Sequence, residues 1–565
     1  RSVHGLPIIE HAEFGRNVPD ETVPDADKME LGKIYHMGRE EKADLILNRQ
    51  AMASHTFVTG STGTGKSNAV YHLLDEITKD GRTSFLVVEP AKGEYKNVFG
   101  SRADVKVFGT NPRETPLLRI NPFAFPQDIH ILEHIDRLVE IFNACWPMYA
   151  AMPAVLKDAI ERSYQKAGWN LRNSESEKGV FPTFFDLLDI LPGVIEESHY
   201  SKDTQSDYVG ALCTRVKSLT NGIYGSVFCA EDALSDAELF DCNVVVDLSR
   251  VGSMETKSLL MGILVMKLQE YRMCGSEMNS RLRHVTVLEE AHNLLRKTSA
   301  EQSQEGANLQ GKSVEMLANA IAEMRTYGEG FIIADQAPGL LDMSVIRNTN
   351  TKIILRLPDE EDRKLVGKSA ALKEAQIDEL SKLPLGVAAV YQNEWPEAVL
   401  CKIEAYPMPE NAVYHKPSKM PHEINAEFVF GQLAAGKELE PLSISEMEQL
   451  KLWLKRHEMM LKPGDSRYLE QVFAGGELDV AKTRKAVFDF FGGISTVVDY
   501  CAVAEKSFTP RKEFLEQLQG QYGLKAAAAD WVLNSVISMG MSLNPDAKAV
   551  DNLRTNFEQQ GGRVL

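Results

Sequence analysis

One glycine-rich loop constrains the fold of this chain more than any other feature. Residues Gly60–Ser67 read GSTGTGKS and match the pattern G-x-x-x-x-G-K-[ST]. An apolar run, Thr56–Thr59, precedes the loop, and a helical pattern, Asn68–Ile77, follows it. Glycines let backbone N–H groups surround phosphate oxygens, and the first turn of the following helix adds a favourable field. The pattern therefore predicts a strand, loop and helix that together bind the phosphates of a nucleotide.

The side chains of this loop have distinct expected roles. We expect the Lys66 ammonium to reach the β- and γ-phosphates of ATP, and the Ser67 hydroxyl to coordinate Mg²⁺. ATP and Mg²⁺ are thus the predicted cofactors. The predicted nucleotide-binding residues are Gly60, Ser61, Thr62, Gly63, Thr64, Gly65, Lys66, Ser67 and Asn68.

Two carboxylates follow a second apolar run, His284–Leu288. At such a strand end, a carboxylate can hold Mg²⁺ and another can polarise the attacking water. We assign Glu289 to the metal and Glu290 to the water. Aspartate is the usual residue at the first position, so Glu289 is a departure, although its longer side chain can still reach the metal.

Three further residues are candidates for the reaction. Gln336 follows the apolar run Phe331–Ala334 and is predicted to sense the γ-phosphate from a neighbouring strand. If the protein works as a ring, an arginine from another subunit should meet the charge of the transition state. Arg325 is the first candidate for this role and Arg347 the second. The alternative for either arginine is a surface charge near a helix end.

Short apolar runs with little polar alternation recur through the chain. Such runs are typical of strands buried on both faces, as in a parallel sheet covered by helices. The sequence therefore predicts an α/β fold with a mostly parallel central sheet. The strand candidates are Thr56–Thr59, Ser84–Glu89, Val105–Phe108, Asn243–Leu248, His284–Leu288, Phe331–Ala334 and Lys352–Leu357, with Val387–Gln392 and Ala398–Glu404 as a hairpin at the sheet edge.

The same patterns predict the domain organisation. We expect residues 1–50 to be a linker and the end of a missing N-terminal domain, with one short strand candidate near Leu31–His36. Residues 51–408 are the predicted ATPase domain, interrupted by a helical insertion at about 124–241. Residues 409–565 are predicted to form a C-terminal helical domain. Its helix candidates are Ile444–Leu461, Asp479–Phe491, Arg511–Tyr522 and Ala526–Ser542.

The composition is that of a folded protein, with 44% hydrophobic and 25% charged residues. The seven cysteines form no C-x-x-C pair, which argues against a zinc site and is typical of a reducing, cytoplasmic location. No apolar run reaches the ~18–20 residues of a membrane helix, so we expect no membrane contact. The net charge is −18; an acidic protein that grips DNA must confine its positive charge to a small surface, such as the lining of a ring.

The ordered motifs resemble those of the HerA branch of the HerA/FtsK superfamily of hexameric P-loop ATPases. The resemblance implies a RecA-like sheet, a hexameric ring of identical subunits, ATP-driven translocation of double-stranded DNA, and a nuclease or other effector as partner. It also places Lys66, Glu290, Gln336 and Arg325 at the positions of the catalytic lysine, catalytic acid, sensor and arginine finger. The motifs are HTFVTGSTGTGKS (55–67), VVEPAKGEY (87–95), INPF (120–123), VVVDLSR (244–250), LEEAHNLL (288–295), EMRTYGEGFIIADQAP (323–338) and NTNTKIILRL (348–357).

A polar stretch after the acidic strand is the predicted DNA contact. Residues 296–312 read as a flexible loop, and Arg296, Lys297 and Lys312 could contact DNA phosphates without reading sequence. The alternative is a surface loop that binds nothing. Two other functions stay open: a nucleotide-gated ring scaffold that activates an effector, and a secretion- or conjugation-type ATPase. Stimulation of turnover by DNA would favour the translocase over the scaffold.

Overall fold

The computed structural model describes residues 11–149, 151–176, 179–230, 232–275, 277–298, 306–408, 413–416, 463–473, 479–504, 506, 509–522, 526–544 and 546–560. The chain divides into two compact units. The first comprises Arg1–Lys166, Leu171–Ser174 and Phe181–Lys416, and the second comprises Ala167–Asn170, Glu175–Val180 and Pro417–Leu565.

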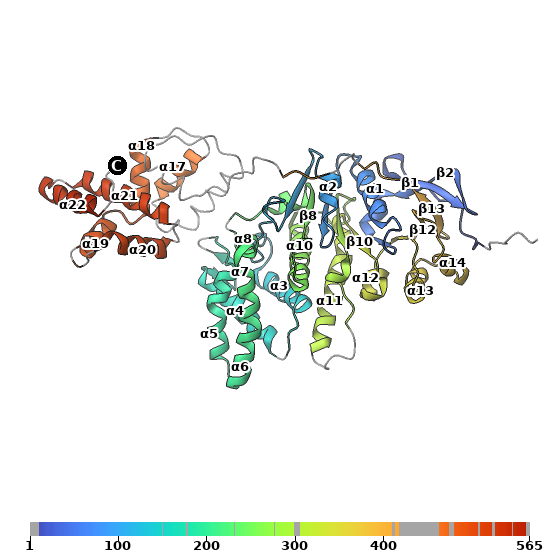
Figure 1. The fold of residues 1–565 in the computed structure, drawn as a ribbon, viewed down its shortest axis with the longest axis horizontal. Helices are drawn as coiled ribbons and strands as arrows, with labels where there is room; N and C mark the ends of the chain where they lie inside the picture. Colours follow the sequence, from blue (N-terminus) through green and yellow to red (C-terminus); the bar gives the residue numbers. More distant parts are fainter. Residues whose placement is uncertain are drawn as a thin grey trace, which may run out of the picture. The chain divides into compact units, whose positions relative to one another are not determined.

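An 11-stranded sheet forms the centre of the first unit (Figure 1). Its parallel strands are β11 (Thr351–Ile354), β3 (Thr56–Thr59), β10 (Glu329–Asp335), β9 (His284–Glu289), β4 (Ser84–Glu89), β8 (Asn243–Asp247) and β5 (Val105–Gly109), in spatial order. Every residue of β3, β9 and β10 is buried, as expected for strands covered on both faces. The predicted α/β fold with a mostly parallel sheet is confirmed.

The antiparallel part of the sheet differs from the prediction. The hairpin of β12 (Val387–Gln392) and β13 (Val399–Ile403) forms as expected, but it does not lie at the edge. Strand β1 (Lys28–His36) pairs with β13, and β2 (Arg39–Asn48) pairs with β1 and forms the edge. Strand β1 covers the short strand candidate near residues 31–36, whereas β2 was not predicted, because charged residues fill its first half.

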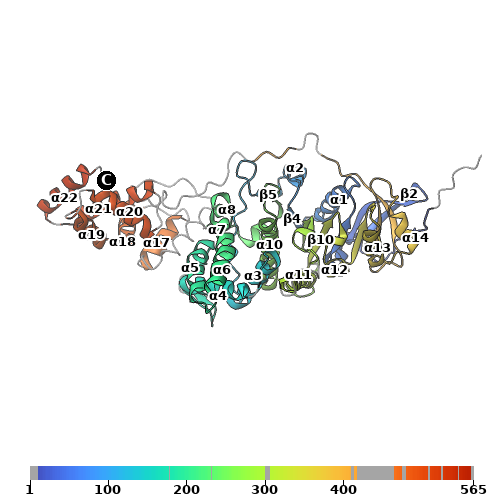
Figure 2. The ribbon, with the colours of Figure 1, turned by 60° about the horizontal axis from the view of Figure 1, so that its bottom comes forward.

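Helices cover both faces of the sheet. Figures 1 and 2 show α1 (Lys66–Thr78) and α2 (Tyr95–Phe99) on one face, and α10 (Met254–Gly275), α11 (Gly306–Glu323) and α12 (Met343–Arg347) on the other. Side chains of α1 and α2, among them Leu74 and Phe99, join those of the sheet in one apolar core. Helices α13 (Glu360–Ser369) and α14 (Glu374–Glu379) lie between β11 and β12 in the chain.

The stretch between β5 and β8 is mostly helical. It packs around a cluster of aromatic rings that includes Phe123, Phe184 and Phe228. Among the described residues of this stretch, β6 (Trp169–Asn170) and β7 (Glu175–Ser176) form a short antiparallel pair, which belongs to the second unit. The helices are α3 (Ile131–Cys145), α4 (Met152–Lys166), α5 (Phe184–Glu197), α6 (Lys202–Tyr208), α7 (Thr214–Thr220), α8 (Gly222–Phe228) and α9 (Asp236–Phe240), with a π-helical turn at Val209–Cys213.

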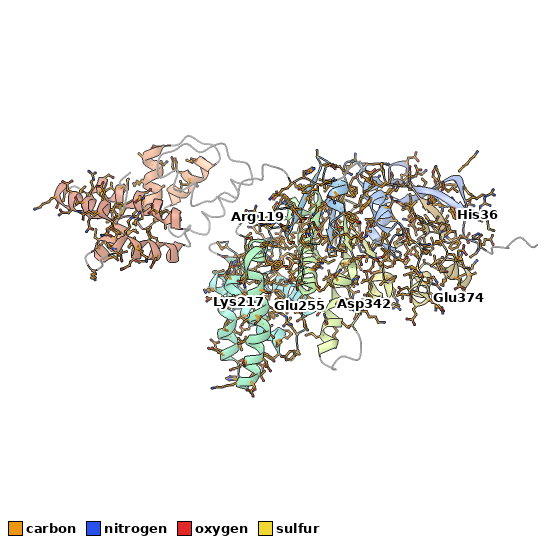
Figure 3. All side chains as sticks on the ribbon, in the orientation of Figure 1. His36, Arg119, Lys217, Glu255, Asp342 and Glu374 are labelled. Carbon is orange, nitrogen blue, oxygen red and sulfur yellow. The ribbon has the colours of Figure 1, made fainter. Side chains whose placement is uncertain are left out.

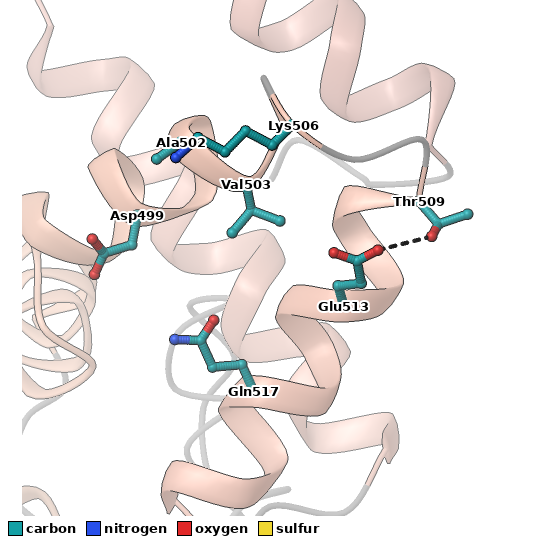
Figure 4. Close-up of a pocket in the computed structure, with 7 residues that line it drawn as sticks. All are labelled: Asp499, Ala502, Val503, Lys506, Thr509, Glu513 and Gln517. Atoms are coloured by element: carbon teal, nitrogen blue, oxygen red, sulfur yellow. Dashed lines mark hydrogen bonds between the residues drawn. The ribbon is translucent and has the colours of Figure 1, made fainter.

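The second unit has a helical core of its own. Its buried residues include Leu469, Phe490, Tyr500 and Leu533. A shallow pocket of about 730 Å³ lies between α19 and α20 and carries mainly polar groups such as Glu513 (Figure 4). The helices are α17 (Pro463–Phe473), α18 (Val480–Phe490), α19 (Ile494–Ala504), α20 (Pro510–Tyr522), α21 (Ala526–Leu543) and α22 (Ala547–Gln559).

Three of the predicted C-terminal helices correspond to α18, α20 and α21. The fourth, at 444–461, lies outside the described residues. Among the helices that the structure describes, none is both long and apolar enough to cross a membrane.

Candidate nucleotide site

The glycine-rich loop and the predicted residues Glu290 and Gln336 meet at the carboxyl-terminal edge of the parallel strands. Strands β3, β10 and β9 are parallel neighbours, so their carboxyl ends lie side by side. The glycine-rich loop follows β3, Glu290 follows β9, and Gln336 follows β10. Ligands of α/β proteins bind in the crevice at the carboxyl ends of such strands. The topology alone therefore explains why three segments far apart in sequence converge here.

Hydrogen bonds within the glycine-rich loop and to the segment after β11 hold the loop in place. The Thr64 hydroxyl donates to the Ser61 carbonyl at 2.7 Å, and the Ser61 N–H donates to the Arg356 carbonyl at 3.0 Å. Gly65 has a φ of 106°, a conformation that L side chains rarely adopt. The loop then enters α1, whose first residues are Lys66 and Ser67.

Lys66 contacts both predicted catalytic carboxylates. Its Nζ lies 3.2 Å from Glu290 Oε1 and 3.6 Å from Glu289 Oε2, and its side chain is almost fully buried. A lysine on a flexible stem acts as a mobile point charge. It can therefore exchange its contacts with carboxylates for contacts with phosphate oxygens.

Glu290 is the hub of a short chain of hydrogen bonds. The Thr62 hydroxyl donates to Gln336 Oε1 at 2.7 Å, and Gln336 Nε2 donates to Glu290 Oε1 at 2.5 Å. Glu290 itself has a φ of 45°. Such a conformation costs a non-glycine residue on the order of 1–3 kcal/mol and is found mainly at functional sites. In this conformation the Glu290 carboxylate contacts Lys66 and Gln336.

Glu289 is tied to a residue that sequence reasoning did not assign. The Tyr95 hydroxyl donates to Glu289 Oε1 at 2.6 Å. Burial raises the pKa of the Glu289 carboxyl, against the opposing effect of Lys66. Glu89 in turn accepts hydrogen bonds from the backbone N–H groups of Glu94 and Tyr95, at 2.8 and 3.0 Å, and burial raises its pKa to about 7. Glu89, Glu94 and Tyr95 all lie in the motif VVEPAKGEY (87–95), which is the sequence feature that points to these contacts.

The donors present suit a hard divalent cation. Ser67 and Glu289 line one cavity together with Lys66, Glu89 and Tyr95. Hydroxyl and carboxylate oxygens are the ligands that Mg²⁺ prefers. Beside it, a cavity of about 260 Å³ lies over the loop and is lined by Ser61, Thr62, Gly63, Gly65, Lys66, Ser67, Asn68, Lys92, Gln336 and Leu385.

Asn68 also serves the fold. Its Nδ2 donates to the Glu404 carbonyl at 2.9 Å, and its Oδ1 accepts from the Tyr406 N–H at 2.9 Å. Asn68 thus anchors α1 to the segment that follows β13, while it lines the cavity over the loop.

A buried carboxylate holds the loop that carries Glu290. The His292 backbone N–H and ring Nδ1 donate to Asp335 Oδ2 at 2.8 and 2.9 Å. The contact raises the pKa of His292, and the bonds from His292 lower that of the fully buried Asp335. Ligand atoms of Glu290, His292 and Asp335 lie within 4.8 Å of one another. The bonds between His292 and Asp335 account for this cluster without a cation.

The two arginine candidates lie far from this edge. Arg325 lies in the 3₁₀ turn Met324–Tyr327, one residue before β10, and Arg347 ends α12, shortly before β11. Both are exposed at the amino ends of the parallel strands. Since a seven-residue strand such as β10 spans roughly 20 Å, neither reaches the site of its own subunit. Their role in a neighbouring subunit stays a prediction.

The predicted DNA-contacting stretch is only partly a loop. Arg296 and Lys297 are exposed in the segment after β9. Residues 299–305 lie outside the described residues, and α11 begins at Gly306, so the prediction of a loop up to Lys312 was wrong. Polar contacts to α3 extend the helix toward its amino end. They join Gln310 Nε2 to the Ala144 carbonyl at 3.0 Å and Ser313 Oγ to Glu140 Oε2 at 2.6 Å.

Comparison with known families identifies this arrangement. The family model described as the central domain of helicase HerA matches residues 29–336, from β1 through the glycine-rich loop to Gln336. The chain belongs to the HerA family. The resemblance read from the motifs is thereby confirmed, and the protein is a HerA-like P-loop ATPase.

Individual relatives are distant but extensive. The chain is 25% identical over 394 residues to the DNA double-strand break repair helicase HerA of Sulfolobus acidocaldarius, covering 68% of this chain and 71% of that protein. It is 23% identical over 436 residues to a probable helicase of Methanocaldococcus jannaschii, covering 70% of this chain and 76% of the relative.

The fold is shared with a solved structure. VirB4 of Thermoanaerobacter pseudethanolicus superposes with a TM-score of 0.52 at 19% identity, over 68% of this chain and 98% of that chain. The plasmid coupling protein TrwB, in complex with ADP and Mg²⁺, aligns with a TM-score of 0.47 at 16% identity, over 71% of this chain and 99% of TrwB.

Proposed function

We propose that the chain is an ATP-driven translocase or helicase that moves double-stranded DNA as a hexameric ring of identical subunits. The observation that carries this proposal is the contact of Lys66, Gln336 and the strained Glu290 at one point. A lysine on a phosphate loop, a carboxylate for water and an amide sensor are the parts that ATP hydrolysis requires. Membership of the HerA family, and similarity to a Sulfolobus helicase of DNA double-strand break repair, support DNA as the substrate.

Each group then has a chemical task in the proposed reaction. Lys66 leaves the carboxylates to contact the β- and γ-phosphates, and the freed Glu290 orients and polarises the attacking water. Gln336 keeps Glu290 in place and reports whether a γ-phosphate is bound. Ser67 and Glu289 would hold Mg²⁺, which would supply positive charge to offset the charge that develops on the phosphates.

The DNA contact in this proposal is electrostatic. Arg296 and Lys297 are exposed just beyond the catalytic strand, and Lys312 is exposed near the start of α11. A few lysines and arginines that line a ring grip the DNA backbone without reading bases, while the rest of the surface keeps the net charge of −18. The proposed partner is a nuclease or another effector enzyme.

In the proposed ring, each subunit supplies an arginine to the nucleotide site of its neighbour. Within the described residues, the candidate arginines Arg325 and Arg347 lie at the opposite edge of the sheet from their own site. In a head-to-tail ring this edge can face the site of the next subunit. We therefore propose Arg325 as the arginine finger, with Arg347 as second choice.

A nucleotide-gated ring scaffold is the second candidate. Glu289 stands where aspartate is usual, and Tyr95 and Lys66 engage its two oxygens. Slow hydrolysis at such a site would let bound ATP hold a ring together and activate an effector. The scaffold predicts turnover that is indifferent to DNA. A secretion- or conjugation-type ATPase is the third candidate.

ATP hydrolysis with and without linear duplex DNA separates these functions. The translocase predicts strong stimulation of the wild-type protein, and loss of turnover in Lys66→Ala and Glu290→Gln. Glu196→Gln, an exposed glutamate at the end of α5, is the matched control and should behave as wild type. Robust turnover that ignores DNA would contradict the translocase and favour the alternatives.

A further inference from the structure

The loops that follow β9 and β10 are joined to each other. Loops after neighbouring parallel strands usually diverge toward their own helices. Here the Asp342 N–H donates to the Leu295 carbonyl at 2.9 Å, and the Lys297 N–H donates to the Leu340 carbonyl at 2.8 Å. Arg296 and Leu341 form an antiparallel bridge between these two bonds. We call residues 291–297 and 336–342 the loop ribbon; Figure 3 labels Asp342 at its end.

One end of the loop ribbon is the catalytic centre. Glu290 directly precedes the first arm, and Gln336 is the first residue of the second arm. Gln336 Nε2 donates a hydrogen bond to Glu290 Oε1 at 2.5 Å. His292, in the first arm, makes two bonds to Asp335, the last residue of β10, which directly precedes the second arm. The Asn293 backbone N–H and Nδ2 both donate to the Glu290 carbonyl, at 2.9 and 2.7 Å. The position of Glu290 therefore depends on how the arms are paired.

The other end of the loop ribbon carries exposed positive charge. Arg296 and Lys297 lie on the same few residues that form the bridge to Leu341. A cavity of about 540 Å³ runs beside the ribbon and is lined by His292, Arg296, Lys297, Gly339 and Leu340 together with residues of α3, α10 and α11. The ribbon thus has space beside it into which it can shift.

We propose that the loop ribbon transmits the binding of a polyanion at Arg296 and Lys297 to Glu290 and Gln336, with His292 as the positioning residue that couples the two arms. Hydrogen-bonded arms move together, so a displacement at the charged end changes the placement of the catalytic carboxylate. This inference rests on the proposed function, which supplies double-stranded DNA as the polyanion.

Because His292 donates to the buried Asp335, a substitution of His292 should disturb the coupling more than a substitution of an exposed residue would. Asp335 is fully buried, and its Oδ2 has the His292 donors as partners while its Oδ1 accepts from the Ala337 N–H at 3.0 Å. Removing the imidazole leaves a buried carboxylate short of a donor, so the local structure must rearrange. Asparagine places an N–H donor close to the position of the histidine Nδ1 and should restore the bond.

The test measures three quantities in the full chain: the affinity for duplex DNA, the basal ATP turnover, and the ratio of DNA-stimulated to basal turnover. In His292→Ala the ratio should fall roughly tenfold, the effect of losing one buried charge-assisted hydrogen bond, while DNA affinity stays near that of wild type. His292→Asn should restore most of the ratio. A wild-type ratio in His292→Ala would overturn the inference.

A second pair of variants keeps the inference testable if His292→Ala fails to fold. Lys297→Ala and Lys297→Pro lose the same ammonium, but only the proline also loses the N–H that donates to Leu340. The stimulation ratio should be clearly lower in the proline variant, and equal ratios would overturn the inference. A wild-type protein that ignores duplex DNA would overturn the proposed function instead, and the inference with it.

Discussion

Gln336 donates a hydrogen bond to Glu290 at 2.5 Å, so the predicted sensor and the predicted catalytic base touch across two neighbouring strands. The bond positions the Glu290 carboxylate, which must orient the attacking water. Its donor, Gln336, is the group that can respond to a γ-phosphate. Sensing and catalysis are therefore joined in one contact.

Gln336→Ala should lower kcat by about 10²-fold, because the donor that places the Glu290 carboxylate is lost. The KM for ATP should change little, since Lys66 and the loop still bind the phosphates. Thr62→Val is the control, because it removes the hydroxyl that donates to Gln336 and leaves the bond to Glu290 intact. Steady-state ATP hydrolysis measures kcat for both variants. The kcat of Gln336→Ala should be lower than that of Thr62→Val, and equal values would contradict this role of Gln336.

Tyr95→Phe should raise the Mg²⁺ concentration needed for half-maximal turnover by roughly 10-fold or more, as is usual when a partner of a metal ligand is lost. The Tyr95 hydroxyl donates to Glu289 and favours its ionised, metal-binding form. Mg²⁺ titrations of the ATPase rate measure the shift. Tyr391→Phe, on β12, is the matched control. An unchanged Mg²⁺ requirement in Tyr95→Phe would remove Glu289 from the metal site.

A ring with an arginine acting between subunits predicts complementation. Arg325→Ala should lower turnover by about 10³-fold, the usual effect of losing an arginine finger. Lys66→Ala should also be inactive. Mixed rings of the two variants contain sites with an intact Lys66 and a neighbour's intact Arg325, so mixing should restore part of the activity. Mixtures that stay inactive at every ratio would argue against Arg325, and the same experiment with Arg347→Ala would then test the second candidate.

Lys352 should make the stability of the protein depend on pH. Burial lowers its pKa to about 8, and its Nζ donates to the Thr349 carbonyl at 2.6 Å. Since this folded-state pKa lies below the ordinary value of 10.5, the unfolded chain binds more protons between these two values, and the contribution of Lys352 to stability rises with pH across that window.

Lys352→Met should therefore stabilise the protein near neutral pH, on the order of 1–3 kcal/mol, because the buried ammonium is removed. The advantage should shrink as the pH rises toward 10.5, because above that value the wild-type lysine is mostly neutral in both states. Urea unfolding at several pH values measures the difference, and Lys382→Met, at an exposed position, is the control. A variant that is less stable than wild type at neutral pH would show that the bond to Thr349 outweighs the cost of burial.

The local features of the fold could be predicted because their signals are local. The glycine-rich loop, the strand before it and the helix after it are contiguous, and apolar runs such as His284–Leu288 indicate strands buried on both faces. Strand β2 was missed because its burial depends on pairing with β1, which no pattern in its own charged residues reveals. The early start of α11 likewise depends on bonds to α3.

Contacts between distant residues account for the rest of the site. The Tyr95 hydroxyl reaches Glu289 across 194 positions of sequence, and His292 reaches Asp335 across 43. Neither pair forms a motif by its spacing, because the sheet order decides which strand ends become neighbours. Residue types alone placed Lys66, Glu290 and Gln336 in one site, whereas the partners that position them emerged from the topology.

Displacement of a third strand from linear duplex DNA tests the central claim most directly, because only a protein that moves along the duplex removes the third strand in its path. The wild-type protein should displace it with ATP, and Glu290→Gln, which keeps Lys66 and the phosphate loop, should not. Full ATP turnover by the wild-type protein without displacement of the third strand would contradict the account.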